Sequence, residues 1–186
     1  MNEDKAKARA QARRIESELD EVYIKSCDAA ITQYFFALEQ YETAKSVFCY
    51  CSVFPEVDTF GIMAGILADG KVLAVPKIIG DGIMEARIVR SLSELVPGKF
   101  GIMESKDGAE ILAPDEIDIA IVPAAAYDAD GYRLGRGGGY YDRYLAETDA
   151  IKVGLTRQSQ LMEHVPHLAH DIPVDILLTE KGCGAR

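Results

Sequence analysis

Apolar residues recur along the chain at intervals that predict alternating helices and strands. Over residues 8–22 they are spaced by three and four positions, which predicts one amphipathic N-terminal helix with Asn2 or Asp4 as its cap. A second helix is expected over about residues 27–39, where apolar and aromatic side chains continue without proline or glycine. The N-terminal quarter of the chain is therefore expected to be helical.

Six runs of apolar and β-branched residues are typical of strands. They are residues 46–53, 71–75, 83–89, 117–122, 151–155 and 175–179. A third helix is expected between the first two of these strands, with Asp58 or Thr59 as its cap and Asp69-Gly70 as its stop. This alternation favours an α/β fold with an open, largely parallel sheet and helices on both faces, a Rossmann-like arrangement in three layers. Residues 91–114 are expected to be mostly loop, because proline and glycine interrupt their short apolar pieces.

Length and composition indicate a single domain covering residues 1–186. The formal net charge of −10 argues against general binding to nucleic acid, which requires a broad basic surface. The longest nearly apolar run, residues 119–127, is too short to cross a bilayer, and the N-terminus is charged, so neither export nor a membrane partner is expected. The four cysteines contain no C-x-x-C pair, which favours reduced thiols in the cytoplasm. We also expect a monomer.

A glycine-rich segment, residues 131–145, carries the clearest sign of binding chemistry. Its central glycines and arginines are Arg133, Gly135, Arg136, Gly137, Gly138 and Gly139. Glycines let backbone N–H groups approach a ligand closely and form an anion-binding nest, and the arginines would add positive charge. The residues from Tyr140 onward lack proline and glycine, so the loop is expected to run into a helix. This combination predicts a site for a polyphosphate.

Two plainer interpretations remain open for the basic and glycine-rich segments. A glycine-rich loop is often only a long surface turn, and this one is neither a Walker A loop nor a G-x-G-x-x-G fingerprint. On the N-terminal helix, Lys5, Arg9 and Arg13 are spaced by four, so they project from one side and could converge on an anion. The same spacing also describes an ordinary solvated basic face.

Polar residues follow several predicted strands at the edge where ligands of open α/β sheets collect. Glu56 follows the first strand, Lys77 the second, and the glycine-rich segment the strand at 117–122. Asp142 could bind Mg²⁺ shared with phosphate oxygens, or serve only as an acid in the first turn of a helix. Asp171 is the candidate second carboxylate.

Three histidines near the C-terminus invite a zinc interpretation. His164, His167 and His170 are spaced by three, but Pro166 breaks the helix that would align them. No cysteine lies close to them in the sequence. A polar loop is the favoured interpretation.

Residues 133–142, with the sequence Arg-Leu-Gly-Arg-Gly-Gly-Gly-Tyr-Tyr-Asp, resemble the signature of the 5-formyltetrahydrofolate cyclo-ligases, also called methenyltetrahydrofolate synthetases. The resemblance extends in family order across nearly the whole chain. It includes the basic N-terminal helix, Glu56-Val57-Asp58-Thr59, Pro76-Lys77 and Asp171-x-x-Val-Asp175.

The resemblance implies a set of ligand contacts. ATP would be held by Lys5, Ala6, Lys7, Ala8, Arg9, Arg133, Leu134, Gly135, Arg136, Gly137, Gly138, Gly139, Tyr140 and Tyr141. The folate substrate would contact Cys51, Glu56, Arg136, Gly137, Gly138, Gly139 and Tyr140. Asp142 and Asp171 match the magnesium positions, and Arg136 is the expected catalytic residue.

The implied reaction is ATP-dependent cyclisation of 5-formyltetrahydrofolate to 5,10-methenyltetrahydrofolate, with release of ADP and phosphate. Transfer of the γ-phosphoryl group to the formyl oxygen would activate the carbon for attack by N10, which needs positioning and charge neutralisation rather than a protein nucleophile. Two alternatives stay open. The phosphate loop could serve another nucleotide or sugar-phosphate reaction, or the chain could be a non-catalytic nucleotide-binding module.

Overall fold

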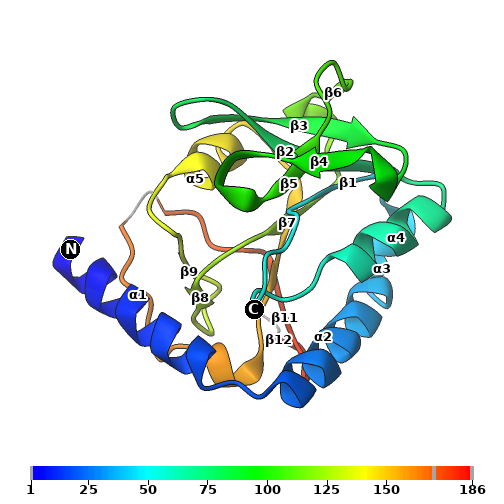
Figure 1. Cartoon of the computed structure of the whole chain (residues 1–186). Coiled ribbons are helices and arrows are strands. Elements are labelled where there is room, and N and C mark those ends of the chain that lie inside the picture. Colours follow the sequence, from blue (N-terminus) through cyan, green and yellow to red (C-terminus); the bar gives the residue numbers. More distant parts are fainter. Residues whose placement is uncertain (1, 169–170, 185–186) are drawn as a thin grey trace.

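A mixed sheet of eight strands forms the centre of the molecule, shown by a computed structural model that describes residues 2–168 and 171–184 (Figure 1). Its order is β12-β11-β10-β7-β1-β2-β3-β6. The strands are β1 (Ser46–Cys49), β2 (Val72–Gly80), β3 (Ile83–Val89), β6 (Ile111–Leu112), β7 (Ile119–Val122), β10 (Ile151–Leu155), β11 (Ile176–Thr179) and β12 (Gly182–Gly184). Strands β11, β10, β7, β1 and β2 are parallel, whereas β12, β3 and β6 pair antiparallel at the two edges.

Helices cover both faces of this sheet. They are α1 (Asn2–Ser17), α2 (Glu21–Phe36), α3 (Glu39–Thr43), α4 (Phe60–Ala68) and α5 (Tyr140–Leu145). Helices α2, α3 and α4 pack on one face and α5 on the other, while α1 lies against a small hairpin outside the sheet (Figure 1). That hairpin consists of β8 (Ala126–Tyr127) and β9 (Arg133–Leu134). The result is a three-layer α/β arrangement.

The alternation of side chains along β1 explains how one strand serves both layers. Val47 and Cys49 are buried in the cluster formed with α2 and α4, and Phe48 is buried in the cluster formed with α5. Phe48 pairs in register with alanines on both neighbouring strands, Ala74 and Ala120. These small neighbours leave room for the Phe48 ring, which lies 5.1 Å from the ring of Tyr144.

The prediction of one long N-terminal helix over residues 8–22 is wrong at its C-terminal end. Helix α1 stops at Ser17, and α2 begins at Glu21 instead of near residue 27. The Asp20 carboxylate accepts hydrogen bonds from the backbone N–H groups of Val22 (2.8 Å) and Tyr23 (3.3 Å), so it caps a new helix. Val22 is 76% exposed and does not continue the buried stripe.

Residues 91–114, expected to be mostly loop, contain additional strands. β4 (Leu95–Pro97) and β5 (Met103–Ser105) form an antiparallel hairpin, and β6 extends the main sheet beside β3. Short 3₁₀ turns occur at Leu92–Glu94, Lys99–Gly101, Pro114–Glu116 and Gln158–Gln160. The first predicted strand is also shorter than expected, since β1 ends at Cys49.

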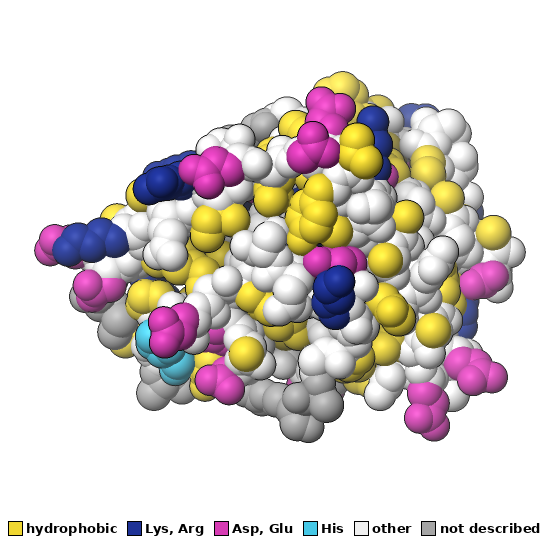
Figure 2. All heavy atoms as spheres, turned by 90° about the horizontal axis from the view of Figure 1, so that it is seen from below, with side chains coloured by type: hydrophobic (Ala, Val, Ile, Leu, Met, Phe, Trp, Pro, Cys, Tyr) yellow, Lys and Arg dark blue, Asp and Glu magenta, His cyan; other side chains and the backbone are white. Residues whose placement is uncertain are grey.

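Two surface properties bear on the function. Within the described chain, none of the helices has the length and apolar character needed to cross a membrane. Figure 2 shows that the lysine and arginine side chains on the face seen from below stand singly or in small groups, several of them beside acidic side chains. Positive charge on this face is therefore local.

Candidate active site

The glycine-rich loop joins the β8–β9 hairpin to helix α5. After β9 ends at Leu134, residues 135–139 turn the chain, and Tyr140 begins α5 as predicted. Gly137 has a φ of +107° and Gly139, the N-cap of α5, a φ of +66°. A residue with a Cβ rarely adopts these backbone conformations, so glycine is required at both positions.

Two side chains, Arg9 and Arg143, hold this loop from outside. Arg9 on α1 donates from Nε to the Gly135 carbonyl at 2.7 Å, so one residue of the predicted basic face reaches the loop. Arg143 on α5 donates from Nη2 to the Gly138 carbonyl and from Nε to the Gly82 carbonyl, both at 2.7 Å. The loop is thereby fixed between α1 and the β2–β3 turn.

Arg136 in the loop pairs with Glu56, which follows β1. The distance from Arg136 Nη2 to Glu56 Oε1 is 2.7 Å, and from Nε to the same oxygen 3.2 Å. The other Glu56 oxygen accepts the Val53 N–H at 2.8 Å. The Glu56 side chain is 12% exposed and that of Arg136 59% exposed, so the arginine can reorient toward a ligand while the carboxylate stays in place.

A cavity of about 390 Å³ lies at this edge of the sheet, beyond the carboxyl ends of β1 and β7. Its polar lining includes Cys51, Glu56, Arg133, Arg136 and Asp142, together with glycines of the loop. Its apolar walls are Pro76, Ile78, Met84, Ile102, Met103, Tyr140 and Tyr141. This size and this mixture are typical of pockets for small organic ligands with an aromatic part.

Tyr141 contributes an unusual hydroxyl to the cavity wall. Its oxygen is buried and has no hydrogen-bond partner among the described residues. Burial raises the pKa of Tyr141 well above its ordinary value, and the nearby Cys49, Cys51 and Glu56 raise it further. Because buried hydroxyl groups are normally paired, this unpaired hydroxyl marks Tyr141 as a candidate for contact with a ligand that enters the cavity.

The two predicted magnesium ligands are both paired with cations. Asp142 forms an ion pair with Arg133, whose Nη1 also donates to the Ile172 carbonyl at 2.9 Å. Lys5 Nζ donates to Asp171 Oδ2 at 2.8 Å. Arg133 therefore lies between Asp142 and the segment that carries Asp171. Carboxylate oxygens are the hard ligands that Mg²⁺ prefers, so this donor set fits the ion.

The residues predicted on the N-terminal helix are divided between two surroundings. Lys5 and Arg9 contact the site segments, but Lys7 pairs with Glu3 at 3.0 Å on the exposed side. Ala8 is buried against the β8–β9 hairpin. Leu134 is fully buried in the same cluster, which leaves its backbone for any ligand contact.

Lys77 does not line the cavity, although it was expected at this edge. It lies within β2, and its ammonium group donates to the Ser105 carbonyl (2.9 Å) and to Asp107 (2.6 Å). It also lies 3.6 Å from Glu104, which does line the cavity. The sequence interpretation missed that β2 continues past Val75 and pairs with a second long strand.

The structure adds site residues that the sequence interpretation missed. Lys99, Ile102, Met103 and Glu104, from the segment expected to be loop, form one wall of the cavity. Glu16 on α1 lies beside Arg136 and Glu56, and burial raises its pKa, an effect that Arg136 opposes. Helical spacing from Arg9 could have indicated Glu16, since the two positions are seven residues apart.

The described histidines lie beside Asp128. The ring of His167 stacks on that of Tyr132 at 3.5 Å, and the His164 Nδ1 lies 4.0 Å from the Asp128 carboxylate. Asp128 uses its two oxygens to accept the N–H groups of Tyr132 and Val165, which organises the loop. His170 lies outside the described residues.

Comparison with known proteins identifies the family. Residues 1–180 match the model of the 5-formyltetrahydrofolate cyclo-ligase family. The chain is 30% identical over 177 residues to the 5-formyltetrahydrofolate cyclo-ligase of Haemophilus influenzae, covering 91% of this chain and 95% of that protein. It is 29% identical over 168 residues to the enzyme of that name from Mus musculus, covering 81% and 80%.

A solved structure agrees with the fold. The NMR structure of Aquifex aeolicus 5,10-methenyltetrahydrofolate synthetase matches with a TM-score of 0.85 at 34% identity, covering 96% of this chain and 91% of that one. This likeness confirms the three-layer α/β fold predicted from the alternation of strands and helices. The glycine-rich signature also led to the correct family, and the chain belongs to the 5-formyltetrahydrofolate cyclo-ligase family.

Proposed function

We propose that this chain carries out the reaction of its family, the ATP- and Mg²⁺-dependent cyclisation of 5-formyltetrahydrofolate to 5,10-methenyltetrahydrofolate with release of ADP and phosphate. The observation that carries the proposal is the contact between Arg136 and Glu56. It joins the loop expected to hold ATP to the segment expected to hold the folate, at the mouth of one cavity. Two substrates held on either side of this contact would meet there.

The chemistry requires activation of a formamide oxygen, which is a poor leaving group. Transfer of the γ-phosphoryl group to that oxygen produces an imidoyl phosphate, and attack by N10 on the carbon then closes the ring and expels phosphate. The protein positions the reactants and neutralises charge in such a transfer. Arg136 would leave Glu56 to contact the phosphoryl oxygens, and the amides of the glycine-rich loop would face the same group.

Asp142 and Asp171 are the residues that would hold magnesium. Bound Mg²⁺ supplies charge neutralisation to the phosphate oxygens. Arg133 and Lys5, which pair with these carboxylates, would contact phosphate oxygens themselves once the ion is bound. The four groups thus offer two negative and two positive charges to a nucleotide with its metal.

The apolar cavity is the proposed folate site. Tyr140, Met84 and Ile102 offer flat or flexible apolar surfaces to a ring system, and the Tyr141 hydroxyl and the Glu56 carboxylate offer one donor and one acceptor. Cys51 lines the cavity but is only 2% exposed. A folate contact with Cys51 would therefore be made close to the end of β1.

A spectrophotometric assay tests the reaction directly. The near-ultraviolet band of the conjugated methenyl product is expected only when 5-formyltetrahydrofolate, ATP and Mg²⁺ are all present. Arg136→Ala is expected to lower turnover by roughly 100-fold or more, because it removes a preorganised charge from the transferring group. Arg14→Ala is the matched control, since Arg14 is exposed and pairs only with the adjacent-turn Glu18 among its described contacts.

Two results would contradict this proposal. A flat trace from folded protein whose melting point rises with ATP would mean that the loop binds nucleotide for another purpose. Wild-type turnover in Arg136→Ala would show that Arg136 has no role in the reaction.

We further propose that the protein acts as a monomer in the cytoplasm, without nucleic-acid or membrane partners. The net charge of −10 supports the absence of nucleic-acid binding, because phosphate backbones repel an acidic surface. Light scattering during size-exclusion chromatography measures the molar mass, and a dimer mass would overturn the monomer proposal.

A further inference from the structure

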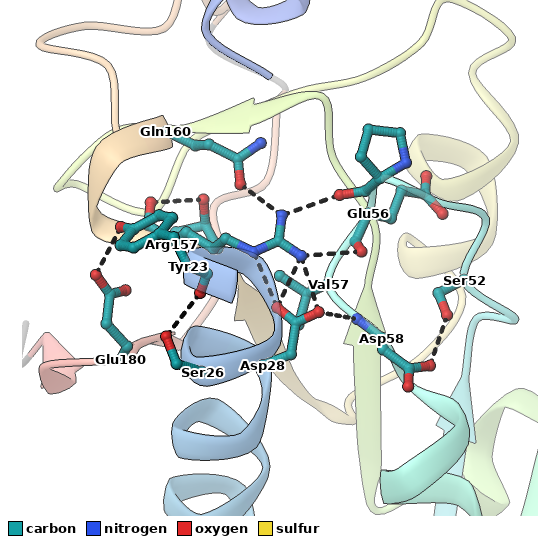
Figure 3. A network of polar contacts seen from close by, with 12 residues as sticks. Tyr23, Ser26, Asp28, Ser52, Glu56, Val57, Asp58, Arg157, Gln160 and Glu180 are labelled. Atoms are coloured by element: carbon teal, nitrogen blue, oxygen red, sulfur yellow. Dashed lines mark hydrogen bonds and ion pairs between the residues drawn. The ribbon is translucent and has the colours of Figure 1, made fainter. Parts of the chain in front are cut away.

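The most deeply buried cation of the described chain is Arg157, which follows β10 and is 0% exposed. All five of its N–H donors have acceptors (Figure 3). Nε and Nη2 donate to the two oxygens of Asp28, each at 2.9 Å. Nη1 donates to the Pro55 carbonyl (2.9 Å) and to Gln160 Oε1 (3.1 Å), and Nη2 also donates to the Glu56 carbonyl (3.1 Å).

Asp28 on α2 also bonds to the segment that Arg157 contacts, residues 55–58. Its Oδ2 accepts the Asp58 N–H at 3.1 Å. The Tyr50 hydroxyl donates to the Val57 carbonyl at 3.1 Å. Every residue from 55 to 58 is thus held by a backbone hydrogen bond, and the Arg157–Asp28 pair supplies those at 55, 56 and 58.

The pair is poorly suited to a role in stability alone. Removing two charges from water costs several kcal/mol per ion, and well-packed apolar residues of similar volume are often equally or more stabilising. Burial raises the pKa of Asp28, although the charge of Arg157 opposes this effect. A buried pair with so large a desolvation cost, and with its donors aimed at one short segment, indicates a requirement for the exact path of that segment.

That segment carries Glu56. Its carboxylate bonds to Arg136 and to the Val53 N–H, so the backbone position of Glu56 decides where both contacts form. Neither Arg157 nor Asp28 is among the described residues that line the 390 Å³ cavity proposed for the folate, so neither would touch the substrate there. The segment at residues 55–58, which carries Glu56, connects them to that cavity.

We propose that Arg157 and Asp28 are positioning residues that hold Glu56 for recognition of the folate substrate. The inference rests on the proposed function, because it takes the cavity beside Glu56 as the folate site. ATP would be held by the glycine-rich loop and α1, which Arg9 and Arg143 fix, so its binding should depend much less on this pair.

Arg157→Lys is the decisive variant. Lysine keeps the positive charge beside Asp28 but has three donors on one nitrogen, so it cannot reach the carbonyls at 55 and 56 and Gln160 together. We expect the KM for 5-formyltetrahydrofolate to rise roughly 10- to 100-fold, because small misplacements of binding groups have effects of this size. The KM for ATP should stay within about twofold, since Arg9 and Arg143 still hold the glycine-rich loop even where the Arg136–Glu56 contact changes.

Two further variants separate positioning from stability. Arg87→Lys alters another arginine of low exposure, one that bonds to the Ala109 carbonyl and Glu85, and it should leave both KM values unchanged. The double variant Asp28→Leu with Arg157→Met removes both charges while keeping apolar volume in place. It should also raise the KM for the folate, even if its melting point equals that of the wild type.

Hydrogen exchange gives a readout that does not need turnover. In Arg157→Lys the amides of Val53, Glu56 and Asp58 should exchange faster, because their bonds depend on the held loop, while those of β1 and β7 should not change. Active wild type with an unaltered folate KM and unaltered exchange in Arg157→Lys would overturn the inference. Inactive wild type with faster loop exchange in the variant would overturn the proposed function and leave the positioning role standing.

Discussion

At the scale of single residues, Tyr141 combines an unpaired buried hydroxyl with a place in the wall of the proposed folate cavity. Its buried hydroxyl has no partner within the described chain, which costs roughly 1–3 kcal/mol in unfolding free energy. Tyr141→Phe is therefore expected to keep or raise the unfolding free energy while raising the KM for 5-formyltetrahydrofolate. Tyr41→Phe is the control: Tyr41 bonds to Asp69 at 2.6 Å, so this variant should lose about 1 kcal/mol and keep its KM. Chemical denaturation and steady-state kinetics measure the two effects.

Glu16 gives a second prediction at this scale, through pH. Burial raises the pKa of its carboxyl above the ordinary 4.5. A carboxyl that binds its proton more tightly in the folded state makes the unfolding free energy fall as pH rises from that ordinary value through the raised one. Glu16→Gln should therefore melt above the wild type at pH 7 and together with it below about pH 4. Melting temperatures of Glu16→Gln and the wild type, compared across this pH range, test the prediction, and a difference that does not change with pH would contradict it.

At the scale of elements, the junction between the glycine-rich loop and α5 depends on a left-handed residue. Gly139 has a φ of +66°, and an added Cβ would lie 2.9 Å from Arg143 Nη1. Gly139→Ala should cost about 1–2 kcal/mol of unfolding free energy because of the backbone conformation. Gly61→Ala in α4 is the opposite case: its Cβ would meet no atom within 4 Å, and alanine should add about 0.5–1 kcal/mol. Equal effects in thermal unfolding would contradict this account.

At the scale of the whole molecule, the layered core separates the four cysteines by reactivity. Cys27, Cys49 and Cys51 are buried and Cys183 is exposed. Burial raises the pKa of the Cys51 thiol to about 12 and raises those of Cys27 and Cys49 as well, so the reactive thiolate is scarce at these positions. A thiol reagent at pH 8 should modify one cysteine quickly in the folded protein and the other three only on unfolding. Cys183→Ser should remove the fast phase, and a fast phase that remains would disprove the assignment.

Elements whose limits are set by local chemistry were predictable. The strands β3 and β10 occupy residues 83–89 and 151–155 as expected, and α4 ends at Ala68 before Asp69 and Gly70, whose φ is +70°. The break between α1 and α2 was not predictable in this way. Leu19 and Val22 continue the apolar spacing, although the chain turns there. The periodicity of the sequence shows where apolar residues recur. The packing of the folded chain decides which of them lie on the same buried face of a helix.

The candidate site was likewise predictable only in part. Glu56 and the glycine-rich loop were expected at one edge of the sheet, because parallel strands end together there. The wall made by Lys99, Ile102, Met103 and Glu104 was not expected, since it depends on β5 packing beside β2. Likewise Arg157 gave no signal in the sequence, because its partner Asp28 is 129 residues away.

The sequence by itself determined the alternation of helices and strands, the glycine-rich loop and the family, because each depends on residues close together in the chain. Only the tertiary structure decided which charges meet: Lys5 with Asp171, Arg136 with Glu56, and Arg157 with Asp28. The composition of the chain does not say which basic side chain pairs with which acidic one. The packing of the layers brings particular pairs together, and the hydrogen-bond geometry available there selects them.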